Sequence, residues 1–222
     1  MNLTPQDQAR IADAIRAAEA RTDGEISAIV AHSSDSYDDV VLHYALLIGL
    51  LPLAVSAVWP GLLVWGASLL NGGWQEPSLR FLLTLALAKS VILFLIARFV
   101  VGLPAVRIAL TPSATKARRV RRRAIMLFRT GTEQRTLTKT GVLLYLSLAE
   151  HRAEIVADAA IHACTPQEQW GEAMTVLIAA VRDDRPVDGI AAAIDRIGTV
   201  LAAHFPYTGT DPNELPDRLI QL

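Results

Sequence analysis

Acidic side chains gather around one predicted turn of this chain, and they are the residues that could best carry chemistry. Glu150 stands at a tight reversal, and Asp158 ends the strand that follows it. Asp35 ends an N-terminal strand and would approach Asp158 if the two strands were parallel neighbours. Carboxylates brought together bind a hard divalent cation such as calcium, or act as a general acid and base. A turn salt bridge with a helix cap at Asp158 is the alternative interpretation.

A basic segment is the second chemical signal. Seven basic residues and no acid lie between positions 116 and 129, although the net charge of the whole chain is only −1. Clustered cations beside a membrane helix attract anionic lipid headgroups, at about 1 kcal/mol each. The residues predicted to bind headgroups are Lys116, Arg118, Arg119, Arg121, Arg122 and Arg123. Alternatively, these charges only set the topology, and no recognition motif supports nucleic-acid binding.

Two apolar runs, at about 44–70 and about 80–103, separate a short polar N-terminal piece from a polar C-terminal half. Each is long enough to cross a bilayer core, which takes about 20 residues. With the short polar connection between them they predict a transmembrane hairpin. The first run carries no charge, whereas Lys89 and Arg98 interrupt the second. Because the first run offers no acid to pair with Lys89, we expect this side chain, near the middle of its span, to snorkel to the interface.

The positions of the basic residues predict the orientation of this hairpin. Arg107 and the basic segment lie within about 20 residues of the end of the second span, where the positive-inside bias operates. We therefore expect an inner-membrane protein with two spans and with its soluble part and both termini in the cytoplasm. The single cysteine, Cys164, fits a reducing compartment.

The polar flanks of the hairpin predict one domain built from both sides of the insertion. Its predicted elements are a helix from Thr4-Pro5, strands at 25–35, 141–149 and 153–158, helices starting near residues 112, 166 and 186, and an extended tail at 205–222. The N-terminal strand must pair with the later strands, because one strand and one helix cannot bury themselves. The predicted organisation is a split domain of 1–40 and 104–222, with the transmembrane hairpin at 44–103.

Three stretches of the sequence resemble the TPM domain family, which includes Psb32-like and MOLO-1-like proteins. They are RIADAIRAAEARTDGEISAIVAHSSD, TGVLLYLSLAEHRAEIVADAAI, and Trp170 beyond them. The hairpin, the basic helix and the ending NELPDRLI resemble a bacterial membrane-protein branch of that family. The resemblance implies an α/β fold, a small three-layer α/β/α domain interrupted by the hairpin. Where many relatives have a glycine-rich turn, this chain has Asp158-Ala159-Ala160-Ile161.

The resemblance also implies functions, because family members take part in the assembly or repair of membrane complexes, some are phosphatases and some bind calcium. The leading hypothesis is a membrane-anchored interaction, assembly or quality-control factor, with anionic lipid and a protein of a membrane complex as partners. The alternatives are a metal-dependent phosphatase, using Asp158 with Asp35 or Glu150, and a membrane scaffold with no ligand.

Overall fold

The computed structural model describes residues 4–73, 76–131, 140–209 and 218–222, and divides the chain into two compact units. Unit 1 combines Met1–Asp35 with Ser113–Leu222, and unit 2 is the intervening Ser36–Pro112. The chain therefore leaves unit 1 after its first strand and returns to complete it. Unit 2 extends beyond the predicted hairpin region of 44–103 at both ends, by residues 36–43 and 104–112.

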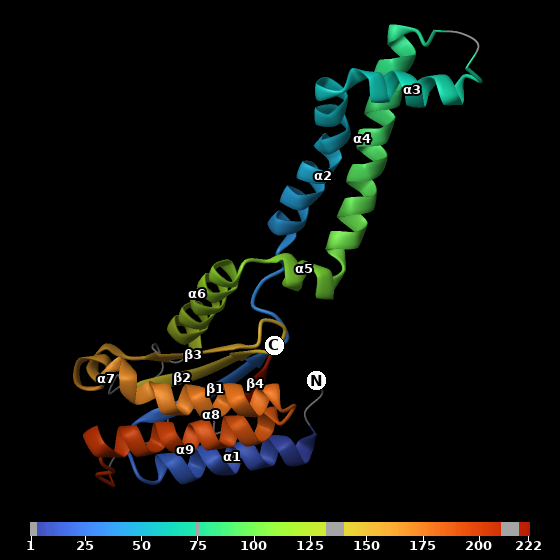
Figure 1. Cartoon of the computed structure of the whole chain (residues 1–222). Helices are drawn as coiled ribbons and strands as arrows, with labels where there is room; N and C mark the ends of the chain where they lie inside the picture. Colours follow the sequence, from blue (N-terminus) through green and yellow to red (C-terminus); the bar gives the residue numbers. More distant parts are fainter. Residues whose placement is uncertain (1–3, 74–75, 132–139, 210–217) are drawn as a thin grey trace. The chain divides into compact units, whose positions relative to one another are not determined.

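A four-stranded sheet in the order β3-β2-β1-β4 forms the middle layer of unit 1 (Figure 1). Strand β1 (Glu25–Ala31) pairs in parallel with β2 (Gly141–Ser147) over seven residues. Strand β3 (Arg152–Ala157) runs antiparallel to β2, and β4 (Leu219–Gln221) runs parallel to β1 on its other side. The predicted pairing of the N-terminal strand with the later sheet is confirmed. The last residues of the predicted extended tail form β4, and residues 210–217 of that tail lie outside the described residues.

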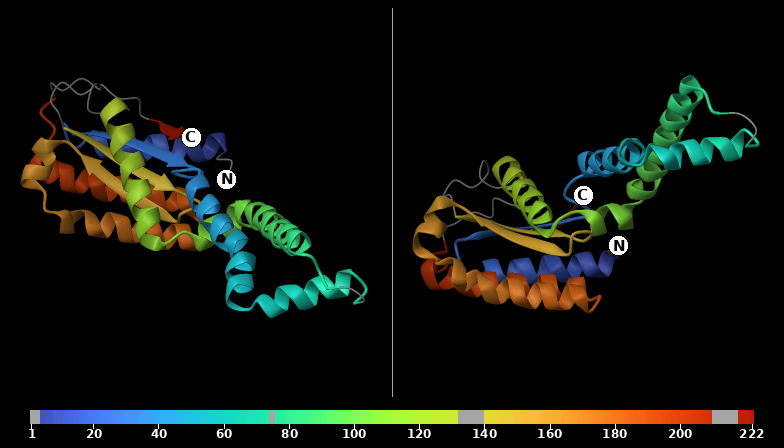
Figure 2. Two further views of the ribbon diagram at one scale, coloured as in Figure 1. Left: turned by 90° about the horizontal axis from the view of Figure 1, so that it is seen from above. Right: turned by 45° about the horizontal axis from the view of Figure 1, so that its top comes forward.

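Helices cover both faces of this sheet and give the three-layer α/β/α architecture (Figures 1 and 2). One face carries α1 (Pro5–Glu19), α8 (Gly171–Arg182) and α9 (Pro186–His204), and the other carries α6 (Ser113–Gly131). Between β3 and α8 lie the short helix α7 (Ala159–Cys164) and the 3-10 turn η1 (Gln167–Trp170). The sequence analysis does not predict α7, whose six residues are too few for a visible apolar repeat.

The sequence pattern accounts for the first two elements. Helix α1 begins with a capping box, in which the Thr4 hydroxyl accepts from the Asp7 amide while the Asp7 carboxylate accepts from the Thr4 amide. Strand β1 is buried at all seven positions, as expected of a central strand with helices on both faces. Ile11 and Ile15 of α1 lie in the larger core with residues of α8 and α9. The smaller core joins the opposite face of the sheet to α6.

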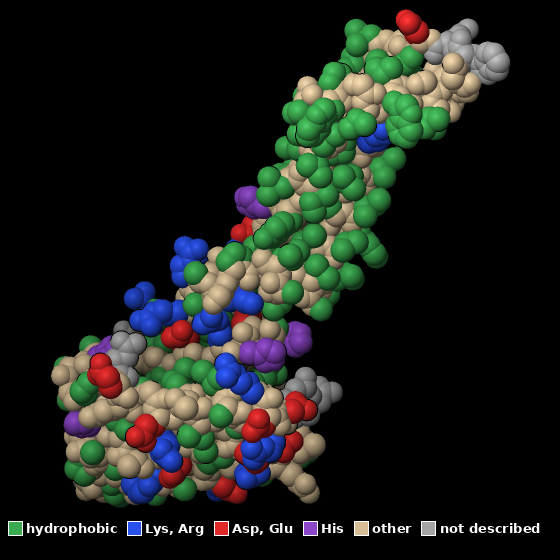
Figure 3. All heavy atoms as spheres, in the orientation of Figure 1, with side chains coloured by type: hydrophobic (Ala, Val, Ile, Leu, Met, Phe, Trp, Pro, Cys, Tyr) green, Lys and Arg blue, Asp and Glu red, His purple; other side chains and the backbone are tan. Residues whose placement is uncertain are grey.

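Unit 2 consists of α2 (Asp38–Val58), α3 (Pro60–Leu70), α4 (Leu79–Gly102) and α5 (Pro104–Leu110). Helices α2 and α4 are long and apolar enough to cross a membrane, and hydrophobic side chains cover the outside of this unit (Figure 3). The predicted first span at about 44–70 is divided between two helices in the structure. The helix ends at Val58, Trp59 has a non-helical backbone, and Pro60 starts a separate helix, because proline lacks the amide that would continue the ladder.

Candidate functional site

The candidate site lies in unit 1 at the carboxyl ends of β1 and β2, where both connections to unit 2 begin. Asp35, the last residue before unit 2, follows the end of β1. Ser113, the first residue after unit 2, accepts a 2.8 Å hydrogen bond from Arg152. Arg152 pairs with Ser147, the last residue of β2. The chain therefore leaves and rejoins unit 1 at one end of the sheet, the end where α/β folds commonly bind ligands.

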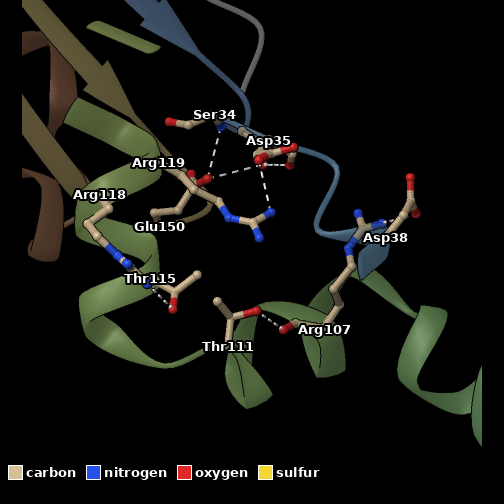
Figure 4. A network of polar contacts seen from close by, with 10 residues as sticks. Ser34, Asp35, Asp38, Arg107, Thr111, Thr115, Arg118, Arg119 and Glu150 are labelled. Atoms are coloured by element: carbon tan, nitrogen blue, oxygen red, sulfur yellow. Dashed lines mark hydrogen bonds and ion pairs between the residues drawn. The ribbon is translucent and has the colours of Figure 1, made fainter. Parts of the chain in front are cut away.

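Glu150 fixes the segment through which the chain leaves the sheet (Figure 4). Its side chain is buried, and its Oε1 accepts from the Ser34 amide at 2.9 Å and the Ser33 hydroxyl at 3.2 Å. Its Oε2 accepts from the fully buried Ser147 hydroxyl. Hydrogen bonds to a buried carboxylate are stronger than those between neutral groups, and they compensate for its lost hydration. We call Glu150, Ser33, Ser34 and Ser147 the carboxylate latch.

An ion pair adds a second tie at the same place. The Arg119 guanidinium of α6 lies 2.9 Å from the Asp35 carboxylate, with the two side chains 20% and 43% exposed (Figure 4). This pair joins the last residue before unit 2 to the first helix after it. A partly exposed pair of this kind contributes about 1 kcal/mol at most to stability. Its main effect is therefore to position the two segments that it joins. The sequence analysis names Asp35 for metal binding and Arg119 for lipid binding, whereas in the structure they bind each other.

Tyr145 extends the latch into the smaller core. Its ring is fully buried, and its hydroxyl lies 3.0 Å from the Ser34 hydroxyl. Burial raises the pKa of the Tyr145 phenol above the usual 10, while hydrogen bonds from Ser34 and Ser147 oppose the rise. The phenol therefore stays neutral throughout the physiological range and serves as a hydrogen-bonding group.

A pH titration should reveal this environment. Because the ionised phenol is disfavoured only in the folded state, stability is fully present below pH 10 and should fall as the pH rises above about 10. Absorbance at 295 nm should show one tyrosine titrating above the range of free tyrosine, and that step should disappear in Tyr145→Phe. A step of the same pKa remaining in Tyr145→Phe would assign it to another tyrosine.

Helix α6 has an apolar and a basic face. Val120, Ala124 and Phe128 are buried against the sheet, as the sequence spacing predicts. Of the six residues predicted to bind headgroups, Arg118, Arg121 and Arg122 are exposed, whereas Lys116, Arg119 and Arg123 are half-buried. Arg121 also lies 3.6 Å from Glu154 of β3. Lysine and arginine side chains gather along this helix on the molecular surface (Figure 3).

The three carboxylates predicted to share a metal ion do not come together. Asp158 follows the end of antiparallel β3, and its carboxylate accepts from the Gly141 amide at 2.9 Å, at the start of β2. Asp35 and Glu150 lie at the other end of β2, about 20 Å away at 3.3 Å per residue. Asp35 and Asp158 would meet only if their strands were parallel neighbours, and they are not. This set does not fit one shared calcium ion.

Nor does another acidic or histidine cluster replace it. Among the described residues, no three His, Cys, Asp or Glu side chains are placed to hold a metal ion. Asp158 instead stands at the N-cap position of α7, where its side chain makes no cap hydrogen bond, and its carboxylate closes the β2–β3 pair at the far end. The carboxylate site in this structure is a set of internal hydrogen bonds.

A small pocket opens beside the latch, on the face covered by α8 and α9. Its volume is about 230 Å³, and it is lined by His32, Leu148, Ala149, His151, Val181, Asp184 and Pro186. His151 and Asp184 have left-handed backbones, with φ of 48° and 57°, which fit the tight turns that they occupy. The sequence analysis does not single out this pocket, because its lining comes from three separate turns.

Comparison with known proteins supports the fold. The family model described as the TPM domain matches residues 104–200. That match begins at α5 and leaves out α1 and β1, which the insertion separates from the rest of the domain in sequence. No curated protein matches the chain.

A solved structure, that of the BA42 protein from the psychrophilic bacterium Bizionia argentinensis, resembles this one with a TM-score of 0.58 and 17% sequence identity. The comparison covers 100% of this chain and 97% of the other. At that identity the likeness concerns the fold alone. Together with the match of residues 104–200 to the TPM domain model, it supports the α/β fold of the domain built around the latch.

Proposed function

We propose that this chain is a membrane-anchored TPM-like domain that acts as an interaction, assembly or quality-control factor at the cytoplasmic face of a bacterial inner membrane. The supporting observation is the pairing of β1 with β2 over seven residues. These strands lie on opposite sides of unit 2 in the sequence, so both must occupy one compartment. An insertion between them crosses the membrane an even number of times, and α2 and α4 supply two suitable helices.

The carboxylate latch supports the proposed anchoring, because it holds the chain in place where it leaves unit 1. Glu150 holds Ser33 and Ser34 on one connection, while Arg152 contacts Ser113 on the other. These residues all belong to unit 1, and fixed connections at one end of its sheet suit an anchored domain that binds a partner protein.

The geometry does not favour the metal-dependent phosphatase, because its proposed carboxylates lie at opposite ends of the sheet. The scaffold alternative differs from the leading proposal in having no partner surface. Binding of lipid headgroups by the basic face of α6 would distinguish the two proposals, because a pure scaffold needs no headgroup contacts beyond those that set the topology.

The outward arginines of α6 should bind anionic headgroups. In proteoliposomes, a donor fluorophore on the exposed Cys164 should transfer more energy to acceptor lipids when phosphatidylglycerol is present than in purely zwitterionic vesicles. At about 1 kcal/mol for each cation near the surface, a variant with Arg118→Gln, Arg121→Gln and Arg122→Gln should lose most of this difference. Added salt should weaken it in the wild type.

A matched triple variant provides the control. Arg10→Gln, Arg16→Gln and Arg196→Gln remove the same charge from exposed positions of α1 and α9, on the opposite face of the sheet. This variant should keep the wild-type response to phosphatidylglycerol. Equal responses from the two triple variants would contradict headgroup binding by α6 and favour the scaffold.

A further inference from the structure

Helix α3 is too short to span a membrane and too apolar to lie in water. Its eleven residues extend about 16 Å at 1.5 Å per residue, half the thickness of a hydrocarbon core. It contains no charged side chain, and Leu62, Trp65 and Leu69 are 55–65% exposed. Its one hydroxyl, on Ser68, donates within the helix to the Val64 carbonyl, so every other side chain of α3 is apolar and this one is satisfied internally.

The packing of α2 on α4 fixes the level of α3. A Cβ on Gly49 would lie 2.8 Å from the Phe94 Cβ, so these two residues stand side by side. Helices α2 and α4 run in opposite directions (Figure 1). Val58, the end of α2, is nine residues beyond Gly49 and therefore level with residue 85 of α4. The first turns of α4, with Arg80, extend past that level.

Lys89 is four residues beyond position 85 of α4. Along the helix axis it therefore lies only about 6 Å from the level at which α2 ends. Its amine is 3.4 Å from the point that a Cβ on Gly66 would occupy, so it lies against the middle of α3. The sequence analysis places Lys89 near the middle of a span, where a cation is costly. The offset between the two helices instead places it within snorkelling reach of the far interface.

We infer that α3 lies in the plane of the far leaflet, with its apolar side chains among the acyl chains and the Lys89 amine beside it on a phospholipid phosphate. Trp59 and Trp65, 59% and 65% exposed, supply the amphipathic rings that favour this interfacial zone. The occupant of the exposed face of α3 is therefore phospholipid. This inference rests on the proposed membrane anchoring of unit 2.

Nitroxide depth measurements test the inference on the full chain in phosphatidylethanolamine/phosphatidylglycerol vesicles. In a Cys164→Ser background, labels at Leu62→Cys and Leu69→Cys, on one face of α3, should lie at the same depth within about 3 Å. A spanning helix would separate them by about 10 Å, from seven residues of rise. Labels at Leu46→Cys and Leu53→Cys, equally spaced on the exposed face of α2, should show that 10 Å difference.

The outcomes separate the inference from the proposal on which it rests. A depth difference along both helices would overturn the in-plane position of α3 while leaving membrane anchoring intact. No difference along α2 would overturn the anchoring itself. Poor access of the α3 labels to both oxygen and the water-soluble nickel reagent would place α3 against protein and contradict a lipid occupant.

Two substitutions of Lys89 test the role of its amine. With Lys89→Leu, the label at Leu62→Cys should move towards the bilayer centre, because the cation that holds α3 at the phosphate level is lost. Lys89→Arg keeps the charge and should leave the depth unchanged. An unchanged depth in Lys89→Leu, or an equal shift in both variants, would contradict the anchoring role of the amine.

Discussion

Replacing Glu150 by alanine should lower the free energy of unfolding of unit 1 by about 3 kcal/mol, because it leaves the Ser147 hydroxyl and the Ser34 amide without their acceptor. Ser147 is fully buried and has Glu150 as its acceptor. The Ser34 amide loses its acceptor at the same time, whereas the Ser33 hydroxyl keeps the Asp35 carbonyl at 2.9 Å. Each buried donor left without a partner costs about 1–3 kcal/mol. Urea titration in nanodiscs, followed by hydrogen exchange of β1 and β2, measures the loss.

Two variants give this experiment its controls. Glu150→Gln keeps one carbonyl acceptor and should cost less than alanine. Glu154, on the same hairpin, is half-buried, and burial raises the pKa of its carboxyl group despite Arg121 and Arg152 nearby. Its ionised form is therefore poorly stabilised, and Glu154→Ala should cost under about 1 kcal/mol. Equal losses in Glu150→Ala and Glu154→Ala would show that the latch carries no special stability.

The latch also predicts where the structure should open first. In Glu150→Ala, the amide of Ser34 should exchange much faster than in the wild type at urea concentrations where β2 is still protected. The expected pattern is local, because Ser34 lies between the sheet and unit 2. Uniform loss of protection throughout the sheet would indicate global destabilisation and contradict a local tether.

A valine at position 198 should destabilise unit 1 by about 2–3 kcal/mol, because α1 and α9 approach closely there. A Cβ on Gly198 would lie 2.6 Å from the Ala18 Cβ and 3.1 Å from its Cα. The Ala18 atoms cannot rotate away, so the two helices must separate. Since α1 precedes unit 2 and α9 follows it, the separation weakens the contact between the two halves of the split domain. Urea titration should show a lower midpoint.

Gly171→Val is the matched control for that substitution. Gly171 is the first residue of α8, and a Cβ there would meet nothing within 4 Å. The same side chain should therefore change the free energy of unfolding by less than about 0.5 kcal/mol, as usual for surface substitutions. A loss in Gly171→Val as large as in Gly198→Val would point to a general effect of the valine side chain and contradict the close-contact explanation.

The sequence predicts the parts of this fold that local patterns specify. Strands β1, β2 and β3 are apolar runs bounded by turn residues, and the Thr4-Pro5 start of α1 is a capping signal read from a few neighbouring residues. The α/β class follows from these elements. The break at Trp59–Pro60 had a local signal in Pro60, but hydropathy averaged over 27 residues hides it. Pro52 lies inside α2 without ending it, so a proline alone does not predict where a helix ends.

The site was less predictable, because its residues depend on tertiary pairing. Glu150 and Asp158 both follow apolar strands, but antiparallel pairing of β2 with β3 places them at opposite ends. The serines of the latch come from positions 33, 34 and 147, with no spacing in common. A serine pair directly after a buried strand was the available signal, and only the parallel register of β1 with β2 brings it to Glu150.

The central claim is that both flanks of the apolar unit fold into one domain on one side of the membrane. Arg21 and Asp195 provide the test, since their side chains meet at 2.8 Å from opposite flanks. In a Cys164→Ser background, Arg21→Cys and Asp195→Cys are joined by a short bismaleimide, and spheroplasts then receive a protease specific for a site inserted between α3 and α4. We predict cleavage from outside, with both fragments remaining in one cross-linked band. Separate fragments, or resistance of the inserted site in intact spheroplasts with cleavage only after lysis, would contradict the account.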